Sequence, residues 1–158
     1  MLTDPSENLS AFCGFPFSVP EADLLIEDGE FGCYAGIDFE IRRTPGHTAG
    51  HVGFLFEGPI VTNGCDESWR ENVRNAMFAG DMMMAGKLGR SVTYGCDEEI
   101  MVKSIQESVF TLPDSTLLFF GHGPSSDVLT ERLTNTLRMS RRRVLGPKPE
   151  VEPSNKPR

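Results

Sequence analysis

Three stretches of this chain share one design, in which a β-strand pattern runs into a glycine turn and a histidine or an aspartate follows. The polar residues are His47, Asp81 and His122. Glycine tolerates positive φ and close backbone approach, so such a turn can present the next side chain at the edge of a sheet. Imidazole and carboxylate groups suit zinc or another divalent metal. The design therefore predicts one shared metal site at a sheet edge. The strand patterns cover residues 37–43, 75–80 and 117–120.

Each of these three residues also has an ordinary structural explanation. A histidine in a glycine-rich turn is commonly a hydrogen-bonded loop residue, and an aspartate after glycine is commonly a turn residue or a helix cap. The three lie 34 and 41 residues apart, which leaves room for a strand or a helix between successive turns. The spacing permits convergence and leaves both interpretations open.

Further strands are expected around the first of these turns. Residues 37–43 alternate apolar and charged side chains, the pattern of a half-buried strand. Residues 52–56 predict its antiparallel neighbour, and residues 24–26 predict a short strand before it. A polar insertion at residues 63–72, with the single tryptophan Trp69, is either a surface loop or a substrate lid.

Two helices follow from capping signals. Asp97 precedes two glutamates and a series of apolar residues at helical spacing, and Pro113 ends that series. The pattern predicts a helix that covers one face of the sheet. Ser126 or Asp127 is expected to cap a second helix that runs to about Leu137 or beyond.

Composition restricts the class of protein. The chain is 39% hydrophobic and 24% charged, with a net charge of −8, as in ordinary soluble globular proteins. No apolar run is long enough for a membrane span, and no signal peptide is visible, so the chain is expected to be cytoplasmic, with free thiols favoured over disulfides for its four cysteines.

Charge is unevenly distributed along the chain. Residues 138–158 carry seven Lys/Arg, which leaves 8 basic and 21 acidic groups before them, a balance of −13. An acidic body argues against nucleic-acid binding, which needs a basic face. Residues 1–137 are therefore expected to form the folded domain, and the basic, proline-rich residues 138–158 a disordered tail.

The stretch 44–51 and the apolar strand after it resemble the metallo-β-lactamase superfamily, and are most similar to its short hydroxyacylglutathione hydrolase (glyoxalase II-like) branch. The resemblance covers about residues 2–137. Other stretches that agree in order are 2–10, 22–29, 79–81 with 85–90, and 119–125 with 131–135.

The resemblance implies a fold and a set of ligands. The fold would be α/β, half of an αββα sandwich, with one mixed, mostly antiparallel sheet covered by helices. By the same resemblance, His47 would bind a first metal, Asp81 would bridge two metals and His122 would bind the second. Zinc would be the metal, with iron or manganese as alternatives.

One hallmark of the family is missing. An H-x-H-x-D-H loop supplies four further ligands in complete members, and this chain has only three histidines, His47, His51 and His122. The chain thus looks like the C-terminal half of such a domain, and residues 1–137 are expected to lack its N-terminal half.

The resemblance implies hydrolysis of an acyl thioester of the hydroxyacylglutathione type by a metal-held hydroxide. Lys87 and Arg90, in a loop after Asp81, are candidates to contact an anionic substrate, or are solvated. Three alternatives stay open. They are an inactive half-domain that needs a complementary N-terminal half, a homo-oligomer that assembles the site from two copies, and an iron enzyme similar to persulfide dioxygenases.

Overall fold

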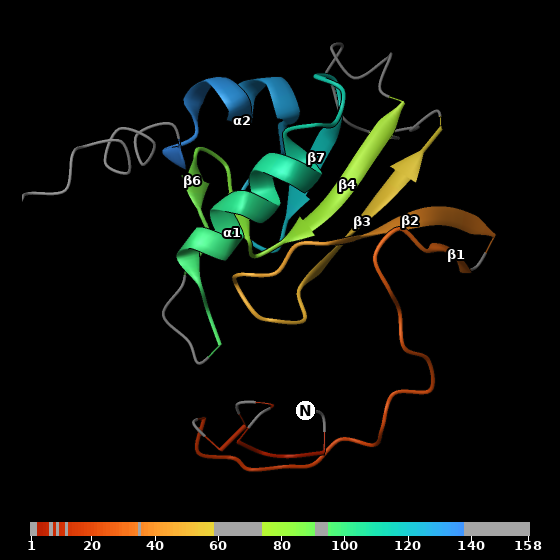
Figure 1. Ribbon diagram of the computed structural model, residues 1–158, viewed down its shortest axis with the longest axis vertical. Helices are drawn as coiled ribbons and strands as arrows, with labels where there is room; N and C mark the ends of the chain where they lie inside the picture. Colours follow the sequence, from red (N-terminus) through yellow and green to blue (C-terminus); the bar gives the residue numbers. More distant parts are fainter. Residues whose placement is uncertain are drawn as a thin grey trace, which may run out of the picture.

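A computed structural model of the 158-residue chain (Figure 1) describes residues 3–6, 8, 10–11, 13–34, 36–58, 74–90 and 95–137. Two predictions lie outside the described residues: the insertion at residues 63–72 with Trp69, and the tail at residues 138–158.

A six-stranded sheet forms the framework, with strand order β1-β2-β3-β4-β7-β8. Strands β1 to β4 pair antiparallel in succession, β4 and β7 pair in parallel, and β8 returns antiparallel to β7. β5 and β6 form a separate two-stranded hairpin. The expected α/β fold with a mixed, mostly antiparallel sheet is confirmed. The strands are β1 (Phe31–Tyr34), β2 (Ile37–Arg43), β3 (Val52–Glu57), β4 (Asn75–Gly80), β5 (Met83–Met84), β6 (Lys87–Leu88), β7 (Leu117–Phe120) and β8 (Ser126–Asp127).

The first predicted helix forms at its expected cap. The Asp97 carboxylate accepts a hydrogen bond of 2.9 Å from the amide of Ile100, and α1 (Glu98–Ser104) begins there. α1 continues into a single π-helical segment, η2 (Ile105–Val109). Together they span most of the predicted helix, which ends before Pro113.

The second predicted helix, α2 (Val128–Thr134), is shorter than expected. Asp127 caps it by accepting a hydrogen bond from a first-turn amide, so Asp127 rather than Ser126 is the N-cap. The helix does not reach Leu137, because the backbone of Asn135 is extended.

The predicted strand at residues 24–26 is wrong. Leu24 and Leu25 are exposed and pair with no strand among the described residues. The neighbouring edge of β2 is already occupied, because Ile41 exchanges backbone hydrogen bonds with Gly29 and Glu30.

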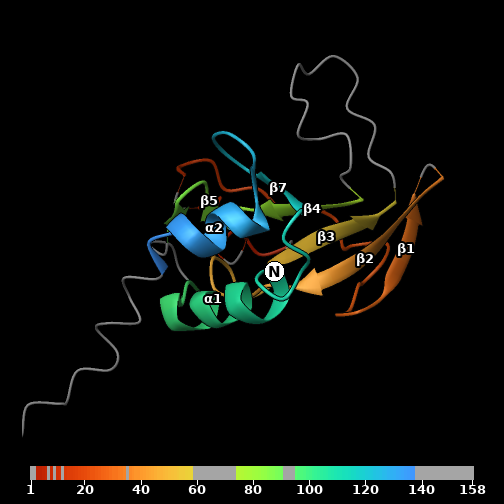
Figure 2. The same cartoon turned by 90° about the horizontal axis from the view of Figure 1, so that it is seen from above.

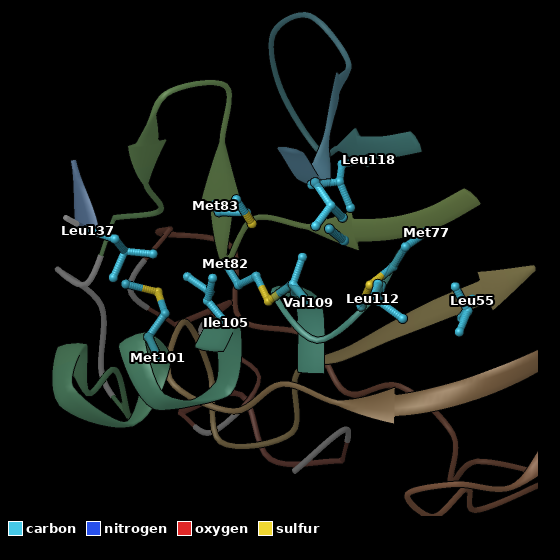
Figure 3. Close-up of a cluster of buried hydrophobic side chains, with 12 residues drawn as sticks. Leu55, Met77, Met82, Met83, Met101, Ile105, Val109, Leu112, Leu118 and Leu137 are labelled. Carbon is cyan, nitrogen blue, oxygen red and sulfur yellow. The ribbon is translucent and has the colours of Figure 1, made fainter. Parts of the chain in front are cut away.

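One face of the sheet carries the hydrophobic core. Side chains from β3, β4 and β7 meet side chains from the β5–β6 hairpin, α1, η2 and α2, as Figure 3 shows for most of them. Figures 1 and 2 place both helices near β4 and β7 and away from β1. The helices therefore pack beside the two strands that lead into Asp81 and His122. The buried members are Leu55, Met77, Ala79, Met82, Met83, Met101, Ile105, Val109, Leu112, Leu118, Val128 and Leu137.

The opposite face carries a row of phenylalanines across four strands, which we call the aromatic row. Neighbouring rings are 5.1–5.7 Å apart between centroids. Such distances are typical of favourable aromatic pairs. Phe78 at the middle of the row is nevertheless 51% exposed. The row consists of Phe39, Phe54, Phe56, Phe78 and Phe119.

Among the described residues, no helix has both the length and the apolar character to cross a bilayer.

Candidate metal centre

Asp81 lies at the end of β4, where the strand turns sharply. Gly80 has φ +57°, a left-handed conformation that favours glycine. The register between β4 and β7 shifts at this point, and the Gly121 amide donates a hydrogen bond of 3.1 Å to the carbonyl of Gly80. Because β4 and β7 are parallel, both glycine turns lie at the same edge of the sheet.

This edge brings Asp81 and His122 together. His122 Nε2 lies 3.5 Å from Asp81 Oδ2. The approach depends on Gly121, because a Cβ there would overlap with Asp81 Oδ1. The predicted juxtaposition of the second and third ligand residues is therefore present.

The second carboxylate oxygen of Asp81 has an unusual environment. Asp81 Oδ1 is buried and accepts no hydrogen bond from the described residues. Leaving a buried acceptor unpaired costs about 1–3 kcal/mol. A carboxylate oxygen without a donor, beside an imidazole, is a donor set that fits a divalent cation.

His47 lies in the turn between β2 and β3, and residues at both ends of α1 hold that turn. The Asp97 amide donates to the carbonyl of Gly46 at 2.8 Å, and Cys96 Sγ donates to the carbonyl of His47 at 2.7 Å. Ser104 Oγ donates to the carbonyl of Pro45 at 2.7 Å. These bonds fix the backbone that carries the His47 imidazole.

One ring nitrogen of His47 also forms a hydrogen bond with the backbone. Nδ1 lies 2.8 Å from the carbonyl oxygen of Arg90. Because a carbonyl only accepts, Nδ1 must carry the hydrogen, and the neutral ring then has its lone pair on Nε2. A metal-binding histidine usually donates the N–H of its other ring nitrogen to a carbonyl or carboxylate, which fixes the tautomer and the orientation of the ring.

His51 is a site residue whose role the sequence patterns did not reveal. Its Nδ1 is hydrogen-bonded to Thr44 Oγ1 at 2.8 Å, and a Cβ at Gly80 would lie 2.6 Å from its Nε2. His51 therefore links the end of β2 to the end of β4. The only signal in the sequence is its place four residues after His47, whose ring centroid lies 6.0 Å away.

Burial lowers the pKa of His51 below its ordinary value, and the neighbouring His47 acts in the same direction, while Asp81 opposes them. His51 is therefore neutral near neutral pH. A neutral ring adds no positive charge that would repel a cation.

The full predicted ligand set is not assembled in this structure. Among the described residues, no group of three or more His, Cys, Asp or Glu side chains is arranged to hold a metal ion. Asp81 and His122 form a pair, and His47 stands beside His51. Lys87 and Arg90 are exposed, and their contact with substrate stays a prediction.

No protein-family model matches the chain. The chain is 34% identical over 136 residues to the probable metallo-hydrolase YqgX of Bacillus subtilis, covering 85% of this chain and 57% of that protein. It is 29% identical over 125 residues to the hydroxyacylglutathione hydrolase GloC of Haemophilus influenzae, covering 75% of this chain and 52% of that protein. The chain thus spans about half the length of the curated relatives it matches.

Solved structures give the same assignment. The BLEG-1 B3 metallo-β-lactamase superposes with a TM-score of 0.66 at 25% identity, over 85% of this chain and 58% of that one. The protein TTHA1623, solved in a di-iron-bound form, superposes with a TM-score of 0.53 at 26% identity, over 83% of this chain and 57% of that one. The fold and these relatives agree, and the chain belongs to the metallo-β-lactamase superfamily.

Proposed function

We propose that this chain contributes a metal-binding edge to a metal-dependent hydrolase that acts on acyl thioesters of the hydroxyacylglutathione type. The observation that carries the proposal is the Asp81–His122 pair, with its buried and unpaired carboxylate oxygen. The names of the two curated relatives support hydrolysis, and one of them is a hydroxyacylglutathione hydrolase.

Three side chains would hold the metal. Asp81 would bridge two ions, because Oδ1 accepts no hydrogen bond from the described residues and Oδ2 lies 3.5 Å from His122 Nε2. His47 would bind through Nε2, which the Arg90 carbonyl leaves as the unprotonated nitrogen. Zinc fits this donor set, and iron or manganese are alternatives.

A divalent metal at this edge would lower the pKa of a water molecule and polarise a thioester carbonyl. The chain's own residues perform the positioning. Gly80 and Gly121 allow the carboxylate to approach β7. The Arg90 carbonyl orients the His47 ring. We propose that the exposed cations of Lys87 and Arg90 attract the carboxylates of a glutathione moiety.

Zinc titration of the purified chain tests the ligand assignment. We expect His47→Ala and Asp81→Ala to abolish zinc binding, whereas the exposed control Asp38→Ala should bind like the unmodified chain. Full zinc occupancy in both ligand variants would refute the assignment. Hydrolysis is then measured with a hydroxyacylglutathione, against an acyl-coenzyme A thioester as comparison. Oxygen uptake by the iron-loaded chain with glutathione persulfide would instead favour the dioxygenase-like interpretation.

The aromatic row favours a second candidate function, the binding of a complementary half of the domain. We propose that the row is the surface on which a complementary N-terminal half, carrying the H-x-H-x-D-H ligands, completes the site. Exposed Phe78 at the centre of the row would be buried by a second sheet, since sheets pack face to face through apolar side chains. A row of this kind left in water is a recognised sign of an interaction surface.

Mixing this chain with a separately produced N-terminal half of a relative tests that proposal. We expect complex formation in sedimentation experiments, a gain of bound zinc and onset of thioesterase activity. Phe78→Ser should weaken the complex, while Leu25→Ser, an exposed apolar residue outside the row, should not. Metal binding and turnover by this chain alone, as a monomer, would refute the need for a complementary half.

A further inference from the structure

We propose that Glu131, a buried carboxylate on α2, is a positioning residue for the metal centre and acts on His47 through the β5–β6 hairpin. The inference rests on the proposed metal-binding function of this sheet edge. Glu131 is only 1% exposed. Burying a carboxylate costs free energy unless hydrogen bonds compensate for the lost hydration. The hydrogen-bond partners of Glu131 therefore indicate which part of the fold it stabilises.

Those partners lie at the tip of the hairpin. The amide of Gly86 donates to both carboxylate oxygens of Glu131, at 3.2 and 3.0 Å. The side-chain amide of Asn135, one helical turn further along, donates to Oε2 at 2.7 Å. One backbone N–H aimed at two oxygens of a fixed carboxylate fixes the direction of the turn.

Two further bonds join the same end of α2 to the hairpin. Asn135 Nδ2 donates to the carbonyl of Lys87 at 3.3 Å, and the Thr136 amide donates to the carbonyl of Gly86 at 3.1 Å. Gly86 has φ +75°, a conformation that other residues adopt at a cost. Hydrogen bonds from the C-terminal end of α2 thus fix the tip of the hairpin.

The base of the hairpin lies next to two residues of the proposed metal site, Asp81 and His47. β5 begins two residues after Asp81, and the Gly89 amide donates to the carbonyl of Met82 at 3.0 Å to close the hairpin. A Cβ at Gly89 would overlap with the backbone carbonyl of Asp81. The next residue, Arg90, supplies the carbonyl that accepts the Nδ1 hydrogen of His47.

A continuous series of contacts therefore runs from α2 to His47. Glu131 fixes Gly86 at the tip, the paired strands carry that constraint to the base, and the Arg90 carbonyl sets the orientation of the His47 ring. A purely structural Glu131 would affect the stability of the fold and leave the ring unaffected. A positioning Glu131 affects both.

Glu131→Gln tests this distinction, since it retains the shape of the side chain and replaces one acceptor oxygen with a donor. The matched control is Val128→Ala, a buried core residue one turn earlier in α2. Two quantities are measured for each variant: the tautomer of His47 by nitrogen NMR of the metal-free chain at mildly alkaline pH, and the zinc dissociation constant.

In the unmodified chain the Nδ1–H tautomer of His47 should dominate. We expect Glu131→Gln to mix the two tautomers and to weaken zinc binding by about 10- to 100-fold, the usual effect of losing an outer support of a ligand. Val128→Ala should lower the melting temperature and leave both quantities unchanged. A Glu131→Gln variant that is less stable but keeps the tautomer and the zinc affinity would overturn the proposal.

If Glu131→Gln does not fold, Asn135→Ala provides the second variant, because it removes the Lys87 contact and retains the carboxylate. It should shift the tautomer in the same direction, and an unchanged tautomer in this variant would also overturn the proposal. The tautomer is measured without metal. A chain that binds no zinc but still shows the shift would therefore refute zinc binding by this chain alone and retain the positioning role.

Discussion

Gly121→Ala is predicted to displace the Asp81 carboxylate without altering its chemistry. A Cβ at position 121 would overlap with Asp81 Oδ1 and would lie 3.0 Å from Asp81 Cγ. Position 121 is not among the glycines with positive φ, so the alanine backbone should be tolerated there. The perturbation is therefore a collision with one carboxylate.

The magnitude follows from that geometry. Restoring van der Waals contact requires the oxygen to move by more than about 1 Å, and overpacking of this kind costs about 1–3 kcal/mol of folding stability. Asp81 would then no longer meet a metal shared with His122. We expect the zinc affinity to fall at least about 10-fold, which corresponds to about 1.4 kcal/mol.

A matched control separates stability from geometry. Gly36 has φ +77° and open space around its Cβ position, so Gly36→Ala should cost about 1–2 kcal/mol through backbone strain alone. Urea unfolding gives the stability of each variant, and competition with a chromophoric chelator gives the zinc affinity. Equal zinc affinities in the two variants would refute the proposed role of the Gly121–Asp81 contact.

Three further predictions concern the surroundings of the site. Thr44→Val should lower the stability by about 1 kcal/mol in urea unfolding, because it removes the hydrogen-bond partner of the half-buried His51 ring; an unchanged midpoint would contradict it. Asp97→Ala should cost about 1 kcal/mol in thermal unfolding by removing the cap at Ile100, with exposed Asp38→Ala as the control. The pKa of His51 is lowered in the folded state by burial and by His47, so its unfolded form binds the proton more readily. The metal-free chain should therefore lose stability as the pH falls below about 6.5, and His51→Gln should reduce that loss; an identical pH profile would show that another group is responsible.

Local signals in the sequence predicted much of the framework. Alternating apolar and charged side chains predicted β2, the apolar run before Gly121 predicted β7, and Asp97 predicted the start of α1. These predictions succeeded because periodicity and capping depend on residues that are close in sequence. The predicted strand at residues 24–26 failed because a short apolar run forms a strand only where it finds a partner, and residues 29 and 30 rather than 24–26 pair with β2.

The site was predicted in part for the same reason. The strand-to-glycine design correctly brought Asp81 and His122 to one edge. The bond between Glu131 and Gly86 joins residues 45 apart in sequence, and no periodicity connects them. The part played by His51 likewise depends on Gly80, which only the folded sheet brings to its ring.

The parallel pairing of β4 and β7 has a consequence for folding. β1 to β4 are joined in sequence order, whereas β7 can pair with β4 only after the hairpin, α1 and η2 have crossed over between them. Closing so long a connection carries an entropic cost that delays such contacts. Asp81 and His122 are thus expected to meet late, after the antiparallel strands have associated. A metal that needs both residues would bind only the folded chain and would stabilise it by mass action.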